Sequence, residues 1–255
     1  MFKLRDWIPE AKLTSSLSYN SSPWAIDYLE KHPRKIIWEI LSHNPSALKL
    51  LNRNLQKIRW DWLSKNTSAI RLLLKHNKIH WEEFSANPAA IKLLEANQDK
   101  INWNLLCLNP AAIHLLEANP DKICWNNLCF NSAAVHLLEA NPDKIHWQFL
   151  SSNRGAIHLL EQNQDKINWN LLSLNPAAIH LLEANKDKIN WDRLCYNPAA
   201  IHLLEANQDK IDWDNLSHNP EIFEPIRILK PFTEELMQNR FHPNNVDKFE
   251  AWGFE

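Results

Sequence analysis

Glycine is almost missing from this chain, with 2 in 255 residues. Phosphate-binding loops of the P-loop and dinucleotide-binding types need several glycines within a few positions, so the composition argues against a nucleotide site. Long hydrophobic runs are also missing. No stretch approaches the roughly 18 apolar residues of a membrane span, and the N-terminus lacks the apolar segment of a signal peptide. We therefore expect a protein that neither crosses a membrane nor is secreted.

Neither sign of charge dominates, since 28 basic residues stand against 30 acidic ones, for a net charge of −2. The basic residues are not gathered into a block, so the electrostatic pattern typical of nucleic-acid binding is weak. No G-x-S-x-G or H-E-x-x-H motif occurs, and no nucleophile stands beside a recognisable base. The sequence therefore predicts a protein that is not an enzyme and uses no cofactor.

What the chain has in abundance is tryptophan at a fixed interval. Successive tryptophans of one series are 22 residues apart, except for one gap of 21. The series is Trp38, Trp60, Trp81, Trp103, Trp125, Trp147, Trp169, Trp191 and Trp213. A period of 20–50 residues is typical of solenoids, in which one small unit stacks on copies of itself. Such proteins usually present an extended binding surface rather than a catalytic pocket.

One repeat, residues 97–119, predicts two helices. Asn109-Pro110 is a helix start, because Asn can cap the first amides and Pro fits the first helical position. The apolar positions that follow have helical spacing, and Asn119 ends the helix in a left-handed conformation. Asn102 can cap a shorter helix that begins at Trp103. We therefore predict an all-α solenoid of short two-helix repeats, with a β-containing solenoid of leucine-rich type as the alternative.

Atypical terminal repeats are expected to cover the ends of such a stack. The repeat pattern places an N-terminal cap at 1–19, about nine helical repeats at 20–219 and a C-terminal cap at 220–255. The four cysteines are expected to be free thiols. Cys107, Cys129 and Cys195 occupy a position that holds Ser in the other repeats, which indicates selection for a small side chain.

The recurring residues have structural interpretations. The tryptophans are expected to be core residues, because each lies three positions before a buried-type Leu or Phe. A Lys precedes each tryptophan by three residues, as Lys100 precedes Trp103, and is expected to bind carbonyls at the end of the preceding helix. The alternative is a cationic row for an anionic partner, although an adjacent Asp offsets its charge in the last six copies.

A row of histidines is a candidate for metal binding. His114, His136, His158, His180 and His202 each precede a Glu by three residues. Two ligands are too few for a stable site, and the same position holds Lys or Arg in other repeats. We therefore predict surface His–Glu pairs within each helix and no metal.

Two positions of the shorter helix vary between repeats, two and five residues after the tryptophan. They lie three apart, so they form one stripe on that helix. In the central repeats the stripe is apolar and aromatic, as expected of a partner-binding surface. The predicted partner-binding residues are Leu105, Leu108, Asn127, Phe130, Phe149, Leu171, Leu174, Arg193 and Tyr196. The alternative is that these side chains only pack between neighbouring short helices.

The repeat N-P-A-A-I-H-L-L-E-A-N-x-D-K-I-N-W resembles the short Asn/Trp-rich repeats in proteins of giant DNA viruses of protists, over residues 20–220. The segment from Phe241 to Phe254 is similar to the closing segment of those proteins. The resemblance implies a viral protein located in the host cytoplasm or the virion, and it implies no chemistry.

We expect a scaffold or adaptor that binds a protein partner, possibly of the host, along the stripe. A self-assembling structural protein of a virion or filament is the alternative, and a nucleic-acid binder is a third.

Overall fold

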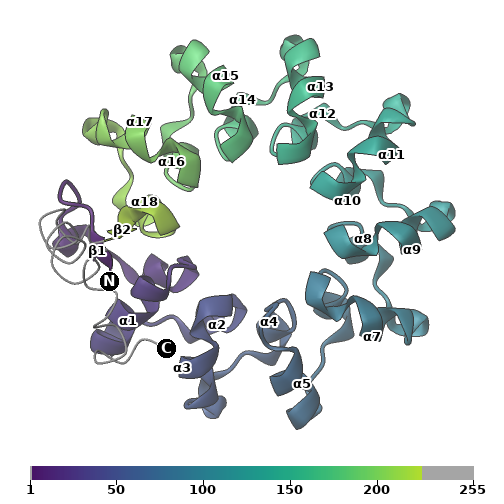
Figure 1. Cartoon of the computed structure of the whole chain (residues 1–255), viewed down its shortest axis with the longest axis horizontal. Coiled ribbons are helices and arrows are strands. Elements are labelled where there is room, and N and C mark those ends of the chain that lie inside the picture. The colour runs from purple at the N-terminus through teal and green to yellow at the C-terminus, as the bar shows by residue number, and fades with distance from the viewer. Residues whose placement is uncertain (1, 226–255) are drawn as a thin grey trace, which may run out of the picture.

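The structure is a computed structural model that describes residues 2–225. It is an all-α solenoid, as the sequence predicts, but the stack of units curves round and closes into a ring (Figure 1). Most units contribute one helix to an outer layer and a shorter one to an inner layer. Strands β1 (Phe2–Leu4) and β2 (Phe223–Pro225) are the two strands among the described residues, so the β-containing alternative is excluded.

The outer layer holds the helices that follow the Asn-Pro motif or its equivalents. They are α1 (Pro23–Lys31), α3 (Leu48–Asn52), α5 (Ile70–His76), α7 (Ile91–Glu95), α9 (Ile113–Ala118), α11 (Val135–Glu139), α13 (Ile157–Gln162), α15 (Ile179–Ala184) and α17 (Ile201–Glu205). Each inner helix begins at a tryptophan of the series. They are α2 (Trp38–His43), α4 (Trp60–Ser64), α6 (Trp81–Phe84), α8 (Trp103–Leu106), α10 (Trp125–Leu128), α12 (Trp147–Leu150), α14 (Trp169–Leu172), α16 (Trp191–Leu194) and α18 (Trp213–Ser217).

The predicted caps form at both helix starts. The Asn109 side chain accepts from the Ala111 amide at 2.9 Å, and a 3₁₀ turn over Pro110–Ala112 leads into α9. Asn102 accepts from the Leu105 amide at 3.1 Å at the start of α8. Both amides are among those that a helix start leaves without an intrahelical partner, so each cap satisfies one of them.

The helix ends differ from the prediction. Asn119 has a φ of −135° rather than a left-handed conformation, and its side chain donates to the Leu115 carbonyl at 2.9 Å. The side chain therefore satisfies a free carbonyl directly, and the chain continues into another 3₁₀ turn at Pro120–Lys122. Within residues 2–225, Asn77 is the one non-glycine residue with a positive φ, 51°. It lies in the repeat that is one residue shorter, where the left-handed residue takes the place of the 3₁₀ turn.

The core lies between the two layers and follows the ring. In most units the Leu three positions after the tryptophan and an Ala just before the outer helix are fully buried, as Leu106 and Ala112 are. The outer helix adds a buried leucine such as Leu116. Because every unit contacts only its neighbours, the stability of the ring is the sum of many local interfaces.

A buried asparagine ladder joins each unit to the one before it. Each ladder side chain donates from Nδ2, at 2.8–3.2 Å, to one or two backbone carbonyls of the preceding unit. The ten members are Asn20, Asn44, Asn66, Asn87, Asn109, Asn131, Asn153, Asn175, Asn197 and Asn219. All are at most 3% exposed. The sequence predicts these residues as helix caps; they are caps and also the main polar link between units.

The ladder has no first or last member. Asn20 donates to the carbonyls of Ser217 and Asn219 at 3.0 and 2.8 Å, the same pattern that its counterparts make within the stack. The 3₁₀ segment Ser15–Tyr19 occupies the inner layer between α18 and α2 and contacts both. Residues 14–31 therefore form a tenth unit, whose inner segment lacks the tryptophan.

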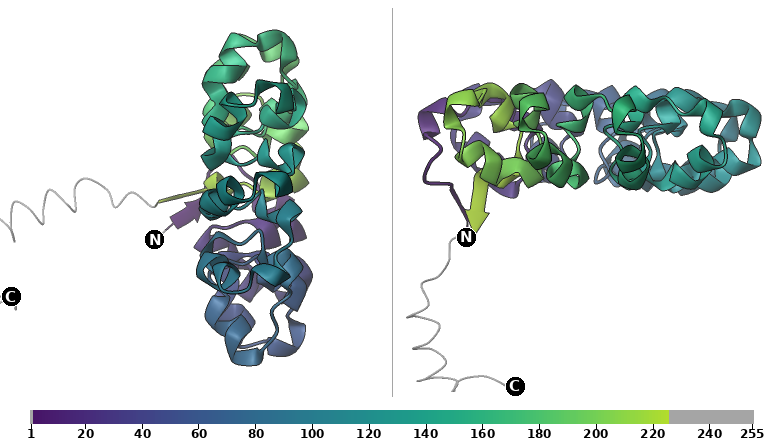
Figure 2. Two further views of the ribbon diagram at one scale, coloured as in Figure 1. Left: turned by 90° about the vertical axis from the view of Figure 1, so that its right-hand side faces the viewer. Right: turned by 90° about the horizontal axis from the view of Figure 1, so that it is seen from above.

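Strands β1 and β2 close the ring by antiparallel pairing, in which Lys3 faces Glu224. Arg5 adds a hydrogen bond from Nε to the Glu221 carbonyl at 2.7 Å and an ion pair with Glu224 at 3.3 Å. The strands project from one side of a flat band (Figure 2). The segments predicted to cap opposite ends of an open stack thus contact each other, while residues 226–255 of the predicted C-terminal cap lie outside the described residues.

Candidate functional site: the inner wall of the ring

The variable stripe lies on the inner face of the ring. On α8, Leu106 and Cys107 are fully buried toward the outer layer. Leu105 and Leu108 lie on the opposite side of the helix, because positions two and five after the tryptophan are turned by roughly half a circle from the buried ones. Since the inner helices surround the ring axis (Figure 1), the side of each inner helix that is turned away from the outer layer faces the centre of the ring. We call the exposed side of the inner helices, at positions one, two and five after each tryptophan, the inner wall.

The predicted binding residues are partly exposed on this wall. Leu105, Leu108, Asn127, Phe149, Leu171 and Leu174 are half-buried, and Arg193 is exposed. Phe130 and Tyr196 are 42% and 37% exposed, among the most exposed large apolar side chains of the described part of the chain. The structure therefore brings all nine onto one continuous surface.

Neighbouring wall residues also contact each other. The rings of Phe130 and Phe149 lie 5.1 Å apart, and His146 stacks on Phe149 at 4.5 Å. Asn127 donates to the Asn104 carbonyl at 2.9 Å, and the Tyr196 hydroxyl to Asn215 at 2.6 Å. Packing between helices, the alternative interpretation of the stripe, accounts for part of its burial and leaves an aromatic face open to solvent.

A cavity of about 560 Å³ lies on this wall. It is lined by Leu174, Asn190, Asp192, Arg193, Tyr196 and Asn215. Three of these are predicted binding residues. A cavity of similar volume, about 570 Å³, lies away from the wall at the joint between the two ends, against Trp24, Tyr28 and Phe223. It belongs to the closure of the ring.

Charge divides the inner wall into two parts. The wall positions of α8, α10, α12 and α14 carry no acidic or basic residue, and we call this the neutral arc. The remaining wall positions, on α16, α18, α2, α4 and α6, hold six acidic and two basic side chains, and we call this the acidic arc. Its charged residues are Glu39, Asp61, Lys65, Glu82, Glu83, Asp192, Arg193 and Asp214. The two arcs face each other across the ring (Figure 1).

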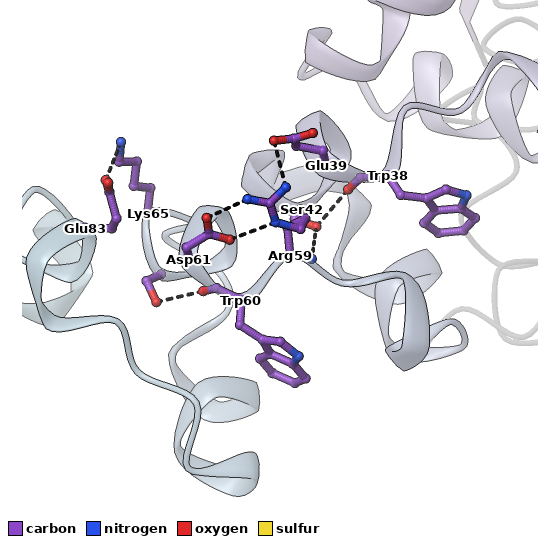
Figure 3. A network of polar contacts seen from close by, with 9 residues as sticks. Trp38, Glu39, Ser42, Arg59, Trp60, Asp61, Lys65 and Glu83 are labelled. Carbon is purple, nitrogen blue, oxygen red and sulfur yellow. Dashed lines mark hydrogen bonds and ion pairs between the residues drawn. The ribbon is translucent and has the colours of Figure 1, made fainter.

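Part of the acidic arc is a network of ion pairs. Arg59, just before the wall positions of α4, contacts Glu39 and Asp61 at 2.9 Å each, and Lys65 pairs with Glu83 (Figure 3). The Arg59 guanidinium lowers the pKa of Asp61 below its usual value. These groups are partly solvated, so each pair contributes little to stability. The network leaves the arc with an excess of negative charge.

Ser42, in the position that alternates between Ser and Cys, links neighbouring units. Its hydroxyl donates to the Trp38 carbonyl at 2.8 Å and accepts from the Arg59 amide at 3.0 Å (Figure 3). In another copy, Cys107 accepts from the Cys124 amide at 3.2 Å. The position thus requires a small side chain that is also an acceptor, and the sequence identified only the size.

The tryptophans are half-buried rather than core residues, which corrects the prediction. Each packs one side against the core, and in five copies a Lys of the next unit covers the ring at 4.4–4.7 Å from the ring centre. The five Lys–Trp pairs are Lys100–Trp81, Lys122–Trp103, Lys166–Trp147, Lys188–Trp169 and Lys210–Trp191. A cation over an indole face is attractive, which explains the strict Lys position better than a carbonyl cap.

Replacing Lys122 by Met should destabilise the protein by about 0.5–1 kcal/mol, the usual value of a partly exposed cation–π contact. Lys144 offers a matched control, because it pairs with Asp143 at 3.0 Å instead of a tryptophan. Lys144→Met should change the free energy of unfolding much less. Equal losses in the two variants, measured by urea unfolding, would contradict the cation–π interpretation.

The histidines pair with a Glu of the preceding unit rather than with the Glu of their own helix. The prediction of His–Glu pairs within each helix was therefore wrong. His114 contacts Glu95 at 2.8 Å and His158 contacts Glu139 at 2.7 Å, and the other three repeat this pattern with the Glu of the preceding unit. These pairs are half-exposed on the outer layer. They form a row of surface bridges along the outside of the ring.

His218 sits in the joint of the ring, stacked on Tyr19 at 4.4 Å and edge-on to Tyr196 at 4.7 Å. Burial lowers its pKa below 6.5, and Asp214 offsets this only in part. As the pH falls through 6.5, the unfolded chain therefore binds the proton first, and stability declines. We expect the wild type to lose stability between pH 7 and pH 5 and His218→Asn to lose less. Thermal melts at both pH values compare them, and identical pH dependence would contradict the assignment.

The chain matches the family model described as NosD, periplasmic copper-binding protein, over residues 54–224. This match covers more than half of the chain, and the chain belongs to that family. No curated protein and no solved structure matches the chain. The matched residues span the repeats from the turn before α4 to β2.

The described residues do not fit the copper ion that the family description names. Copper prefers His, Cys and Met ligands that converge on one point. Within residues 2–225, no three His, Cys, Asp or Glu side chains come together in this way. Cys107, Cys129 and Cys195 are buried and accept hydrogen bonds from backbone amides. Burial raises the pKa of Cys195 to about 11, which disfavours the thiolate that binds metal.

No helix among the described residues is both long and apolar enough to span a bilayer. Variation between repeats predicts the wall residues, but two features of the site do not follow from the sequence. The inward direction of the stripe depends on curvature, which arises from small rotations between units. The charge difference between the arcs becomes visible only when the variable positions are placed in order around the ring.

Proposed function

We propose that this protein is a non-catalytic binding module that holds a segment of a protein partner inside its ring. The observation that carries the proposal is the partly exposed apolar and aromatic neutral arc, with Phe130 as its most exposed large apolar side chain. Exposed aromatic side chains surrounded by polar groups are typical of protein interfaces. The setting we propose, from the resemblance to viral repeat proteins, is a host cytoplasm or a virion.

The closed architecture supports a binding role for the wall. The stacking surfaces that an open solenoid exposes at its ends are covered here by each other, so the ring offers no free stacking surface for another copy. Self-assembly would therefore need a different surface. The excess of acidic groups on the wall also opposes nucleic acid, whose phosphates are negatively charged.

The proposal is tested by site-specific cross-linking. The photoreactive amino acid p-benzoylphenylalanine replaces Phe130 on the inner wall, and Leu74, 49% exposed on outer helix α5, is the matched control position. Irradiation in the native cell should join a protein to position 130 and not to position 74. The adduct should disappear when Leu105 and Leu171 are changed to Ser in a ring that still shows the parent's circular dichroism.

The opposing results are specific. Adducts only between copies of this chain, with light scattering that grows with concentration, would favour a structural role. Adducts with nucleic acid that vanish at high salt would favour nucleic-acid binding. Equal labelling of the two positions would mean that the wall is not the binding surface.

A further inference from the structure

We propose that the occupant of the ring is an amphipathic α-helix with a basic face. Its apolar face would lie on the neutral arc and its basic face on the acidic arc. This inference rests on the proposed function, and it adds the chemistry and the shape of the bound segment. It is carried by the arrangement of the wall residues, by the size of the ring and by the charge of the acidic arc.

The first step is the size of the opening. Packed helices are separated by ~8–10 Å, so the ten inner segments give a perimeter of about 80–100 Å. After about 5 Å is subtracted for the radius of each inner helix with its side chains, the opening is roughly 15–20 Å wide. An α-helix with side chains is about 10–12 Å in diameter. One helix therefore fits inside, with roughly 3–10 Å of the diameter to spare, whereas a folded domain does not fit.

The second step is the apolar half. The neutral arc spans four successive inner helices and presents leucines and phenylalanines, among them Leu105, Phe130, Phe149 and Leu171. Asn104, Asn126, Gln148 and Asn170 lie beside them at the first position after each tryptophan. A surface of large apolar groups bordered by amides suits one apolar stripe of a helix and disfavours a charged one.

The third step is the charged half. Opposite the neutral arc, the wall holds six carboxylates against Lys65, Arg193 and the adjoining Arg59. Arg59 and Lys65 already engage three of these carboxylates, which are Glu39, Asp61 and Glu83. Glu82 is exposed, and Asp192 is exposed on the wall cavity beside Tyr196. A Lys or Arg face on the occupant would offset this excess, and an acidic face would be repelled. The polarity of the wall therefore specifies both faces of the helix.

The test measures binding of defined peptides by fluorescence anisotropy. The probe is a fluorescein-labelled 18-residue peptide of leucine and lysine, patterned so that the leucines form one helical face. One comparison peptide has the same residues in an order without helical periodicity, and the other has glutamate in place of lysine. We expect one probe per ring, bound at least about tenfold more tightly than either comparison peptide, which corresponds to 1.4 kcal/mol.

Paired variants locate the site. Glu82→Gln combined with Asp192→Asn removes two charges from the acidic arc and should weaken the probe about tenfold, with a smaller dependence on salt. Glu117→Gln combined with Glu183→Gln removes the same charge from the outer layer and should leave binding unchanged. Equal weakening by the two pairs, or equal affinity for the glutamate peptide, would overturn the proposal.

Two outcomes separate this inference from the proposed function. If no peptide binds but a protein is cross-linked at position 130, the helix proposal fails and the protein-binding role stands. If neither occurs, both fail. If the unpatterned peptide bound as tightly as the patterned one, binding would depend on amino-acid composition alone. That result would also overturn the helix proposal.

Discussion

Asn131→Ala should destabilise the protein by about 3–5 kcal/mol, more than any surface substitution. The Asn131 side chain donates to the carbonyls of Cys107 and Asn109 at 2.9 and 3.1 Å and accepts from the Ala133 amide at 3.1 Å. Its loss would leave the Cys107 carbonyl and the Ala133 amide without a partner, at a cost of about 1–3 kcal/mol for each one that stays unpaired. The Asn109 carbonyl would keep its bond from the Ala112 amide at 3.1 Å. Urea unfolding followed by circular dichroism measures the difference.

Asn119→Ala is the matched control, because this asparagine is half-buried and makes one hydrogen bond within its own unit. Its loss should cost about 1 kcal/mol. Asn20→Ala extends the comparison to the joint. If the ring is closed, Asn20→Ala should destabilise the protein nearly as much as Asn131→Ala, because Asn20 makes the same two bonds across the joint. A loss no larger than that of Asn119→Ala would indicate an open stack.

Cysteines at positions 3 and 224 should form an intramolecular disulfide in the Lys3→Cys, Glu224→Cys variant. These residues face each other across β1 and β2. The cross-link would close a loop of nearly the whole described chain, and the chain-entropy relation gives a stabilisation of about 5 kcal/mol. We expect a higher melting temperature under oxidising than under reducing conditions, measured in a Cys124→Ser background because the other three native cysteines are buried.

The matched control pairs Lys3→Cys with Asn126→Cys, an exposed position on α10, which lies across the ring from β1 (Figure 1). That variant should stay monomeric and should form no disulfide within the chain. Disulfide-linked dimers of the 3/224 variant, or no cross-link at all, would show that the two ends do not meet in solution.

The repeat unit could be predicted from the sequence, but the closure of the units into a ring could not. The Asn-Pro helix start and the cap at Asn102 follow from side-chain hydrogen bonding over a few residues, and the structure confirms them. Closure instead depends on a small rotation between units, repeated ten times. No single residue encodes it. The one sequence signal for closure is Asn20. It is a ladder asparagine, although no inner helix that begins at a tryptophan precedes it in the sequence.

The candidate site shows the same division. Variation between repeats correctly separated wall positions from core positions such as Leu106. The prediction that the tryptophans are core residues was wrong, because the Lys that covers each ring belongs to the next unit and lies 19 residues away in the sequence, as Lys100 does from Trp81. The His–Glu pairs were assigned within a helix for the same reason, although the nearer Glu in space belongs to the preceding unit.

The continuous asparagine ladder constrains how such a chain can evolve. Ten units that meet end to end must each turn by about 36°, and a solenoid interface is set by contacts between neighbours alone. Duplication of one unit would require every interface to bend less, so copy number is expected to be fixed, unlike in open arrays. The starting point of the chain is not fixed in this way. Joining residue 3 to residue 224 by a short linker and opening the chain at a 3₁₀ turn such as Pro120–Lys122 should give a permuted protein with the same ring.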